Sequence, residues 1–416
     1  MSNLDKPAAA RAPTAPSAPS APSAPSAPRA DQRLARKYRF DDPNMDLFFL
    51  AALGWGKSGG LDVGEVFEIA SHITDGDADS WIRAFEQQAK LLDTQANLWA
   101  AKGWTRAAGE MRLKAFAAYR SAWQFAAPGP TFNRLYELHR PAFAAAMREL
   151  ALPATFFEVP YAGKQLPGVF LTNPRADAPI VLVIGGADTC FEDLFLSVGR
   201  SFFERGYSVA MVDLPGQGAT ANDGLHWEVE AERPIGAVID LLINRFAAQP
   251  GRIALLGMSL GGYFVTRAAG HESRLATVIA STPFPNPNHL FALSVRAAVA
   301  EAHQPVSTAT QRSRLHSLWK AGATDAPEFI AKTAGMAADP KRVTIPFLSI
   351  LGGGDSPVFA EQAMRWHAEI PSTRKSFVLL DAASGADGHC QVNNRLRLVQ
   401  EASGWMDEIF SQASQT

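Results

Sequence analysis

The sequence predicts an α/β protein, in which a mostly parallel β-sheet is covered by helices and preceded by an all-helical domain. Two patterns carry this prediction. After about residue 154, short apolar runs alternate with segments of helical length, which is typical of a parallel sheet buried on both faces. Between residues 44 and 150, apolar side chains instead recur every three or four positions, as in amphipathic helices that pack on one another.

The composition is that of a chain that can bury a large core. The 416 residues are 47% hydrophobic and 19% charged, with a net charge of -2, so nothing favours binding to nucleic acid or to an anionic membrane. The only two cysteines, Cys190 and Cys390, provide neither a disulfide framework nor a thiolate metal cluster. Because no apolar stretch is long enough to span a bilayer and no secretion signal is visible, we expect a cytoplasmic protein.

Residues 1–30 are expected to form an N-terminal tail. The stretch "PAAARAPTAPSAPSAPSAPSAPRA" (7–30) repeats Ala, Pro and Ser and offers no aromatic or branched apolar side chain to bury. Burial therefore cannot offset the entropy lost on ordering, and we expect a disordered tail.

Residues 31–150 are expected to form an N-terminal helical cap domain. A helical stripe of apolar side chains predicts its longest helix, and Phe116, Tyr119 and Trp123 predict a second helical face. We interpret these aromatic stripes as packing between helices rather than as a ligand site. The first stripe consists of Trp81, Phe85, Ala89, Leu92, Ala96 and Trp99.

Residues 151–416 are expected to form the sheet domain. A leading hairpin, "TFFEVP" and "GVFL", precedes six apolar runs that read as strands. Residues 286–340 are too long for a simple crossover and carry apolar residues in helical surroundings, so we expect a helical insertion over the sheet. The six runs cover residues 180–184, 207–213, 252–257, 275–281, 345–351 and 376–380.

The stretch "LLGMSLGG" (255–262) places a serine between glycines directly after an apolar run. The strand "RIALLG" leads into it and a helical segment follows, which is the strand, sharp turn and helix of a nucleophile elbow. The glycines permit the tight turn, and the helix N-terminus favours developing negative charge near Ser259. We therefore predict Ser259 as a nucleophile rather than as part of a Gly-rich turn.

A nucleophilic serine requires a base and an acid that orients the base, in the chain order Ser, Asp or Glu, His for this kind of sheet. Asp355 follows the strand "IPFLSIL", and His389 lies in the loop "ASGADGHCQ" after the last strand. We predict Asp355 as the acid and His389 as the base. The alternatives are Asp381 and Asp387 for the acid and His367, within a helical pattern, for the base.

An acyl-transfer site also requires N–H donors that stabilise an oxyanion. The backbone N–H of Leu260, directly after the nucleophile, is one expected donor. The other is expected from the loop after "IVLVI", at Gly186 or Ala187, where two glycines allow the backbone to approach a substrate. A plain turn from strand to helix is the alternative interpretation of this loop.

Five stretches together resemble a known family: "GEVFEIASHITDGDADSW", "AFAAYRSA", "GGAD", "GMSLGG" and "GADGHCQVNN". The resemblance runs from about residue 44 to 410 and is to the α/β-hydrolases that include 2,6-dihydroxypseudooxynicotine hydrolase and the polyketide-shortening hydrolases. It implies an α/β-hydrolase catalytic domain, a helical cap, the triad Ser259, Asp355 and His389, no metal or other cofactor, and often a homodimer. It further implies an acid at Asp188 in the substrate-binding site and hydrolysis of a carbon–carbon bond next to a ketone.

The resulting hypothesis is a serine hydrolase that cleaves a C–C bond of a β-dicarbonyl or polyketide-like small molecule. The same triad also supports an esterase, a thioesterase, a lactonising cyclase or an acyltransferase, because fold and triad do not determine the leaving group. A protein that binds a small molecule without turnover is a third alternative.

Overall fold

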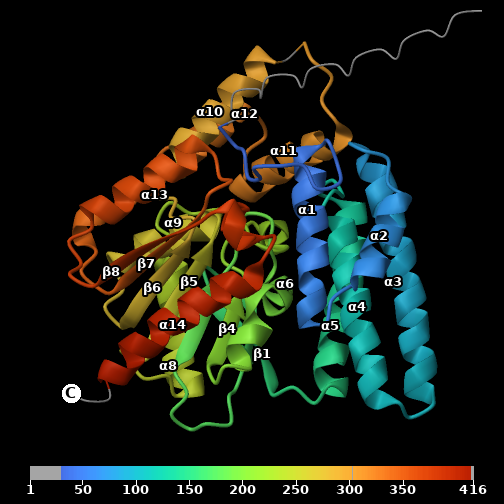
Figure 1. Cartoon of the computed structure of the whole chain (residues 1–416), viewed down its shortest axis with the longest axis horizontal. Coiled ribbons are helices and arrows are strands. Elements are labelled where there is room, and N and C mark those ends of the chain that lie inside the picture. Colours follow the sequence, from blue (N-terminus) through green and yellow to red (C-terminus); the bar gives the residue numbers. More distant parts are fainter. Residues whose placement is uncertain (1–29, 302, 414–416) are drawn as a thin grey trace, which may run out of the picture.

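The structure, a computed structural model, describes residues 30–301 and 303–413. The expected tail of residues 1–30 therefore lies outside the described residues, except for Ala30. A twisted sheet lies on one side of the molecule, and the helices of the N-terminal region stand beside it (Figure 1). The described residues form one eight-stranded sheet in the order β1-β2-β4-β3-β5-β6-β7-β8.

The sheet is mostly parallel, as predicted. The leading hairpin is antiparallel, and β2 also pairs antiparallel with β4, whereas all strands from β4 to β8 in the sheet order pair parallel. The central strands are apolar throughout because helices cover both faces. The strands are β1 (Ala154–Tyr161), β2 (Lys164–Leu171), β3 (Ile180–Ile184), β4 (Ser208–Val212), β5 (Ile253–Met258), β6 (Leu275–Ser281), β7 (Phe347–Gly352) and β8 (Lys375–Leu380).

In the described part of the chain, five α-helices precede the sheet. The predicted aromatic stripe lies on α3, where Trp81 and Phe85 are buried and their rings are 4.7 Å apart. Trp123 on α4 packs on Phe132 of α5, so these aromatic side chains hold the helices together. The helices are α1 (Pro43–Gly54), α2 (Val63–Ser71), α3 (Ala78–Ala101), α4 (Thr105–Trp123) and α5 (Pro130–Glu149).

Further helices surround the sheet. Those between β6 and β7 lie over its upper end, where α11 contacts α1 and α3 (Figure 1). They are α10 (Pro287–Ala300), α11 (Thr308–Ala321) and α12 (Ala326–Thr333). The others are α6 (Phe191–Leu194), α7 (Arg200–Phe203), α8 (Glu232–Phe246), α9 (Leu260–Ala269), α13 (Pro357–Glu369) and α14 (Arg395–Ala413).

None of the helices in the described part of the chain is both long enough and apolar enough to cross a membrane.

Candidate active site

Ser259 occupies the sharp turn between β5 and α9. Its backbone has φ 57° and ψ -122°, a strained conformation for a residue with a side chain. The neighbouring glycines explain why the turn can form. A Cβ on Gly257 would lie 2.2 Å from the Gly261 carbonyl oxygen, and a Cβ on Gly261 would lie 2.4 Å from the Gly185 carbonyl oxygen. The predicted elbow geometry is therefore present, with Ser259 half-buried at the carboxyl edge of the sheet.

His389 and Asp355 meet Ser259 at this edge. His389 Nε2 lies 2.9 Å from Ser259 Oγ, and His389 Nδ1 lies 2.5 Å from Asp355 Oδ1. The other carboxylate oxygen of Asp355 accepts a hydrogen bond of 2.9 Å from the Thr282 hydroxyl. The structure thus brings together three side chains that are 130 and 34 residues apart in the sequence, in the arrangement of nucleophile, base and orienting acid.

The electrostatics of His389 follow from its burial and its partner. Burial is the largest single effect and lowers the pKa of the imidazole, but the attraction and hydrogen bond of the Asp355 carboxylate, together with those of Cys390, raise the pKa of His389 overall. The side chain of Asp355 is fully buried, so water screens this interaction only weakly. A carboxylate on Nδ1 stabilises the imidazolium that forms when Nε2 accepts a proton.

The alternative acids and base lie elsewhere. The Asp387 carboxylate binds Arg36 and Asn393, and that of Asp381 accepts from the backbone N–H of Ser384. His367 lies on α13, where its ring packs on that of Phe377. None of these three alternatives forms a hydrogen bond with Ser259 or His389 within the described residues.

The loop after β3 lies against the nucleophile. A Cβ on Gly186 would be 2.8 Å from Ser259 Cβ, so the backbone approaches this closely only because Gly186 has no side chain. The buried Gln217 side chain donates to the carbonyl oxygens of Gly185 and Gly186, at 2.6 and 3.1 Å. In a trans peptide the following N–H points away from the carbonyl oxygen, so the N–H groups of Gly186 and Ala187 are directed away from Gln217.

The N–H of Leu260 is the other expected donor. Leu260 is the first residue of α9, where backbone N–H groups have no partner inside the helix. Within the described part of the chain, no residue accepts a hydrogen bond from the N–H of Leu260, Gly186 or Ala187. All three are thus available to a ligand.

A small cavity opens onto Ser259 and His389. Its walls include the loop of residues 186–189, and α1 covers it. The lining combines apolar side chains with several charged groups, so the cavity suits a ligand with both characters. Its lining includes Leu47, Phe48, Ala51, Trp55, Arg120, Asp188, Asp193, Met258, Cys390, Val392 and Arg395.

Asp188 lies in this lining and is half-buried. The residue that caps α6 is Cys190, whose N–H is bound by Asp193, so Asp188 is not the cap of the following helix. Its carboxylate forms no hydrogen bond with another described residue, whereas its backbone carbonyl accepts one from Arg120. The oxygens of the Asp188 carboxylate can therefore still accept a hydrogen bond from a ligand.

The chain around residues 30–36 lies against the loops that carry the acid and the base. The Arg33 carbonyl accepts from the His389 N–H at 2.8 Å, and the Gln32 carbonyl accepts from the Ser356 N–H at 3.0 Å. The first described residues thus support Asp355 and His389 from outside, a contact that the sequence analysis did not anticipate.

Sequence reasoning also missed two side chains around Ser259. The Cys390 sulfur accepts from the Ser259 N–H at 3.0 Å, and Thr282 supports Asp355. Thr282 follows β6 directly and has a positive φ of 60°. Its place after a strand of the parallel sheet was the signal that could have identified it, because such positions meet at one edge.

One buried cluster in the described residues has side chains of the kind that bind metals: His139, Cys190 and Glu192. Glu192 is already paired with Arg140, at 3.0 Å, and burial raises the pKa of Cys190 well above its ordinary value. A neutral thiol and a carboxylate already bound to a guanidinium are poor ligands for a cation. The cluster therefore suits structural packing between α5 and the sheet domain better than metal binding.

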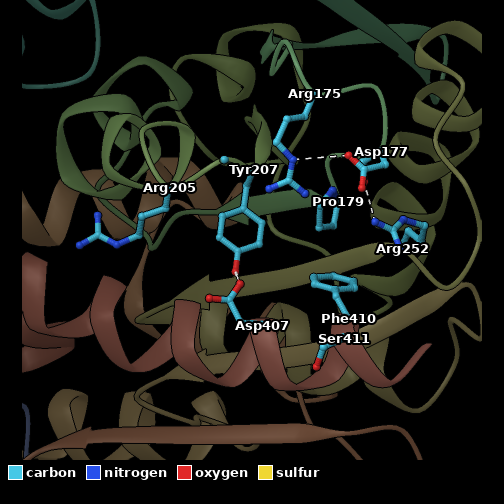
Figure 2. A pocket seen from close by; sticks show the side chains of 10 residues that line it. Arg175, Asp177, Pro179, Arg205, Tyr207, Arg252, Asp407, Phe410 and Ser411 are labelled. Atoms are coloured by element: carbon cyan, nitrogen blue, oxygen red, sulfur yellow. Dashed lines mark hydrogen bonds and ion pairs between the residues drawn. The ribbon is translucent and has the colours of Figure 1, made fainter. Parts of the chain in front are cut away.

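A second hollow lies at the opposite edge of the sheet (Figure 2). Its lining includes Pro179, Tyr207 and Arg252, which are the residues directly before β3, β4 and β5. Its polar groups are paired with one another: Arg175 with Asp177, and the Tyr207 hydroxyl with Asp407. It contains no pair of nucleophile and base, so the cavity at Ser259 is the better candidate active site.

The comparisons with known proteins concern the family and the fold. The sequence pattern of the Alpha/beta hydrolase family matches residues 180–404, which is more than half of the chain. The protein is a member of the alpha/beta hydrolase family. The matched segment begins at β3 and ends within α14, so it contains the elbow, Asp355 and His389.

Relatives of this alpha/beta hydrolase are named as hydrolases of fungi. Alpha/beta hydrolase gkaG of Penicillium citrinum is 31% identical over 246 residues, which cover 56% of this chain and 57% of that protein. 20-hydroxy-prefusarin hydrolase FUS2 of Gibberella moniliformis is 32% identical over 235 residues, covering 53% of this chain and 56% of that protein. The matched part is thus just over half the length of these curated relatives.

Two solved structures extend the likeness beyond the family segment. The 2,6-dihydroxy-pseudo-oxynicotine hydrolase aligns with a TM-score of 0.69 and 19% identity, over 86% of this chain and 96% of that chain. AbyA5 aligns with a TM-score of 0.64 and 16% identity, over 90% and 99%. At these identities the likeness shows the fold, including the helical region that precedes the sheet, and the predicted resemblance is confirmed at that level.

Proposed function

We propose that this alpha/beta hydrolase is a serine hydrolase with Ser259 as nucleophile, His389 as base and Asp355 as orienting acid. The observation that carries the proposal is the continuous chain from Asp355 Oδ1 to His389 at 2.5 Å and from His389 Nε2 to Ser259 Oγ at 2.9 Å. The distances lie within the range needed for proton transfer between nucleophile and base. The strained backbone of Ser259 holds its hydroxyl at the cavity.

In the proposed first step, Ser259 Oγ attacks a substrate carbonyl carbon while His389 Nε2 accepts the hydroxyl proton. The N–H of Leu260 and that of Gly186 or Ala187 stabilise the resulting oxyanion. The bond to the leaving group then breaks, the leaving group takes the electron pair, and His389 returns the proton. Water, deprotonated by His389, finally attacks the acyl-enzyme and regenerates the Ser259 hydroxyl.

The substrate we propose is a β-dicarbonyl or polyketide-like molecule, cleaved at a C–C bond next to a ketone. A carbon leaving group requires a second carbonyl that accepts the electron pair as an enolate, which is then protonated. The carboxylate of Asp188, which lies in the cavity without a hydrogen-bond partner in the described chain, is available for the enol or phenol hydroxyl of such a substrate. The family resemblance and the hydrolase names of the relatives support this choice.

A second candidate is hydrolysis or transfer of an ester or thioester acyl group by the same side chains. It is favoured by the triad geometry itself, because an alcohol or thiol leaving group needs no acid beyond His389. Lactonisation differs only in that a hydroxyl of the substrate replaces water in the second half of the reaction.

The helical region of residues 31–150 is the proposed cap. Leu47, Phe48 and Ala51 of α1 and the adjacent Trp55 form much of the apolar cavity wall. A water-poor wall strengthens the electrostatic interactions at the oxyanion. In this proposal the substrate is therefore bound between the cap and the carboxyl edge of the sheet.

The test incubates purified protein with a β-diketone, an aryl thioester and an aryl ester, and identifies products by mass spectrometry. Products split at the C–C bond are expected, and turnover of esters alone would select the second candidate. Ser259→Ala is expected to lose nearly all turnover, because the triad acts as a unit. Retention of more than about a tenth of the wild-type kcat would refute the nucleophile, and binding without turnover by the wild type would refute a hydrolase.

A further inference from the structure

The carbonyl groups of four successive residues, 185–188, each accept a hydrogen bond from a buried side chain. Gln217 binds the first two. The ammonium of Lys320 donates to the Ala187 carbonyl, and the guanidinium of Arg120 donates to the Asp188 carbonyl. A loop that contains two glycines has many accessible conformations, and these contacts select one.

The two cations come from different parts of the chain. Lys320 lies near the end of α11, in the helices inserted between β6 and β7, and Arg120 lies near the end of α4 in the N-terminal region. Lys320 is 133 residues from Ala187, and Arg120 is 68 residues from Asp188. Both side chains are buried, with 1% and 2% of the residue exposed.

Burial of a lysine is costly unless its charge meets a partner. Lys320 points at a loop carbonyl. Burial lowers the pKa of its ammonium, and the nearby carboxylate of Asp188 opposes this effect. Lys320 itself is not part of the cavity lining. Lys320 therefore acts on the backbone of the loop rather than on a substrate, which is the placement of a positioning group.

We propose that Lys320 is a positioning residue for the oxyanion loop. By holding the Ala187 carbonyl, it fixes the peptide group between Ala187 and Asp188. It thereby anchors the loop directly after the N–H groups of Gly186 and Ala187, and it keeps Asp188 in place. Arg120 holds the next carbonyl, that of Asp188, in the same way. The oxyanion site is then complete only when the N-terminal helices and the inserted helices are both seated on the sheet. This inference rests on the proposed function.

The physical effect is on the transition state. A flexible loop has to be ordered each time the oxyanion forms, whereas a held loop presents its donors at no such cost. Loss of Lys320 should therefore lower kcat and leave KM nearly unchanged, because ground-state binding does not need the same alignment. Complete loss of one oxyanion donor reduces kcat by about 10²–10³, and a loosened donor should reduce it by less.

The test compares wild type with Lys320→Met, which retains the length of the side chain and removes its donors. The readouts are the rate of Ser259 modification by an aryl fluorophosphonate, kcat and KM on whichever substrate the wild type turns over, and the melting temperature. A fall of about tenfold or more in the modification rate and in kcat is expected, with KM nearly unchanged. The melting temperature separates this kinetic effect from a loss of stability, because removing one partner of a buried charge pair can destabilise the fold.

Lys332→Met is the matched control. Lys332 also donates to a backbone carbonyl, that of Gly322, and lies on α12 of the same insertion, but its side chain is 43% exposed. We expect wild-type kinetics for this variant. A similar loss in both variants would show a general effect of the insertion and would overturn the inference.

Two further results would also overturn it: unchanged kinetics in Lys320→Met, or a lower melting temperature with unchanged kinetics. Lys320→Arg covers the case that Lys320→Met does not fold. It keeps the charge but shifts the donors, so a fall of about threefold to tenfold is expected, and kinetics equal to wild type would refute positioning. If the fluorophosphonate modifies Ser259→Ala as fast as wild type, the proposed function fails, which is separate from the outcome for Lys320.

Discussion

Asp355→Asn removes the negative charge beside His389 and keeps the size and shape of the side chain. The two groups are joined at 2.5 Å between His389 Nδ1 and Asp355 Oδ1. Their charge centres are farther apart, and unit charges about 4 Å apart interact by about 4 kcal/mol at an effective dielectric of about 20. This energy corresponds to about three pKa units. The carboxylate raises the pKa of His389, so the substitution is expected to lower it by up to that amount.

The substitution also changes where the proton of His389 resides. The Thr282 hydroxyl donates to one oxygen of Asp355, so the amide that replaces this carboxylate would place its oxygen there and turn its NH₂ group toward Nδ1. Nδ1 must then accept a hydrogen bond, which puts the imidazole proton on Nε2, facing Ser259. A protonated Nε2 cannot accept the serine proton, and the loss of kcat is expected to reach about 10⁴-fold.

The assay follows the rate of Ser259 modification by a fluorophosphonate between pH 5 and pH 10, because this reaction does not require the natural substrate. In wild type the rate should rise as His389 loses its proton. In Asp355→Asn it should be far lower at every pH, with its rise shifted to lower pH. Asp381→Asn is the control, because Asp381 is an exposed residue in the segment before the His389 loop. We expect this variant to have the wild-type dependence of rate on pH. More than about a tenth of the wild-type rate at neutral pH, with an unshifted profile, would refute the role of Asp355.

Two other predictions concern the cavity and the N-terminal helices. Asp188→Asn should reduce C–C cleavage of a β-diketone by about tenfold or more beyond any fall in aryl-ester hydrolysis, because only the carbon leaving group uses a second acid; equal losses on both substrates would contradict this. Trp81→Ala should lower the free energy of unfolding in urea by about 3–5 kcal/mol, since the ring is fully buried and its N–H binds the Ser121 carbonyl. Trp104→Ala, with that residue 53% exposed, should change it by no more than about 0.5 kcal/mol.

The strands were the most predictable part of the fold. The runs at residues 180–184 and 275–281 coincide with β3 and β6 as the structure has them. The reason is that a strand buried on both faces must be apolar along its whole length, so its ends are visible in the sequence. The run starting at residue 345 becomes β7 only from Phe347, because Pro346 has no N–H to donate to a neighbouring strand.

The turn at Ser259 was equally predictable from the sequence, because the steric requirement for glycine acts between residues that are close in the chain. Gly257 and Gly261 are needed within two residues of Ser259 for steric reasons that any sequence with this turn shares. The choice between acids was harder. Asp387 is two residues from His389 in the sequence, yet its carboxylate binds Arg36 and Asn393, whereas Asp355 approaches His389 from another strand end.

The succession of strands along the chain, the position of the nucleophile and the chain order of its partners could be inferred from residues alone, since near neighbours in the chain determine strand and turn conformation. Tertiary packing decided the rest. Three features depend on contacts between distant segments: Lys320 donates to the Ala187 carbonyl, the Arg33 carbonyl binds the His389 N–H, and Asp188 lines the cavity. No local pattern encodes such contacts, because a lysine on a helix is ordinarily solvated and is held in the interior only when the packed chain offers it a carbonyl and a carboxylate.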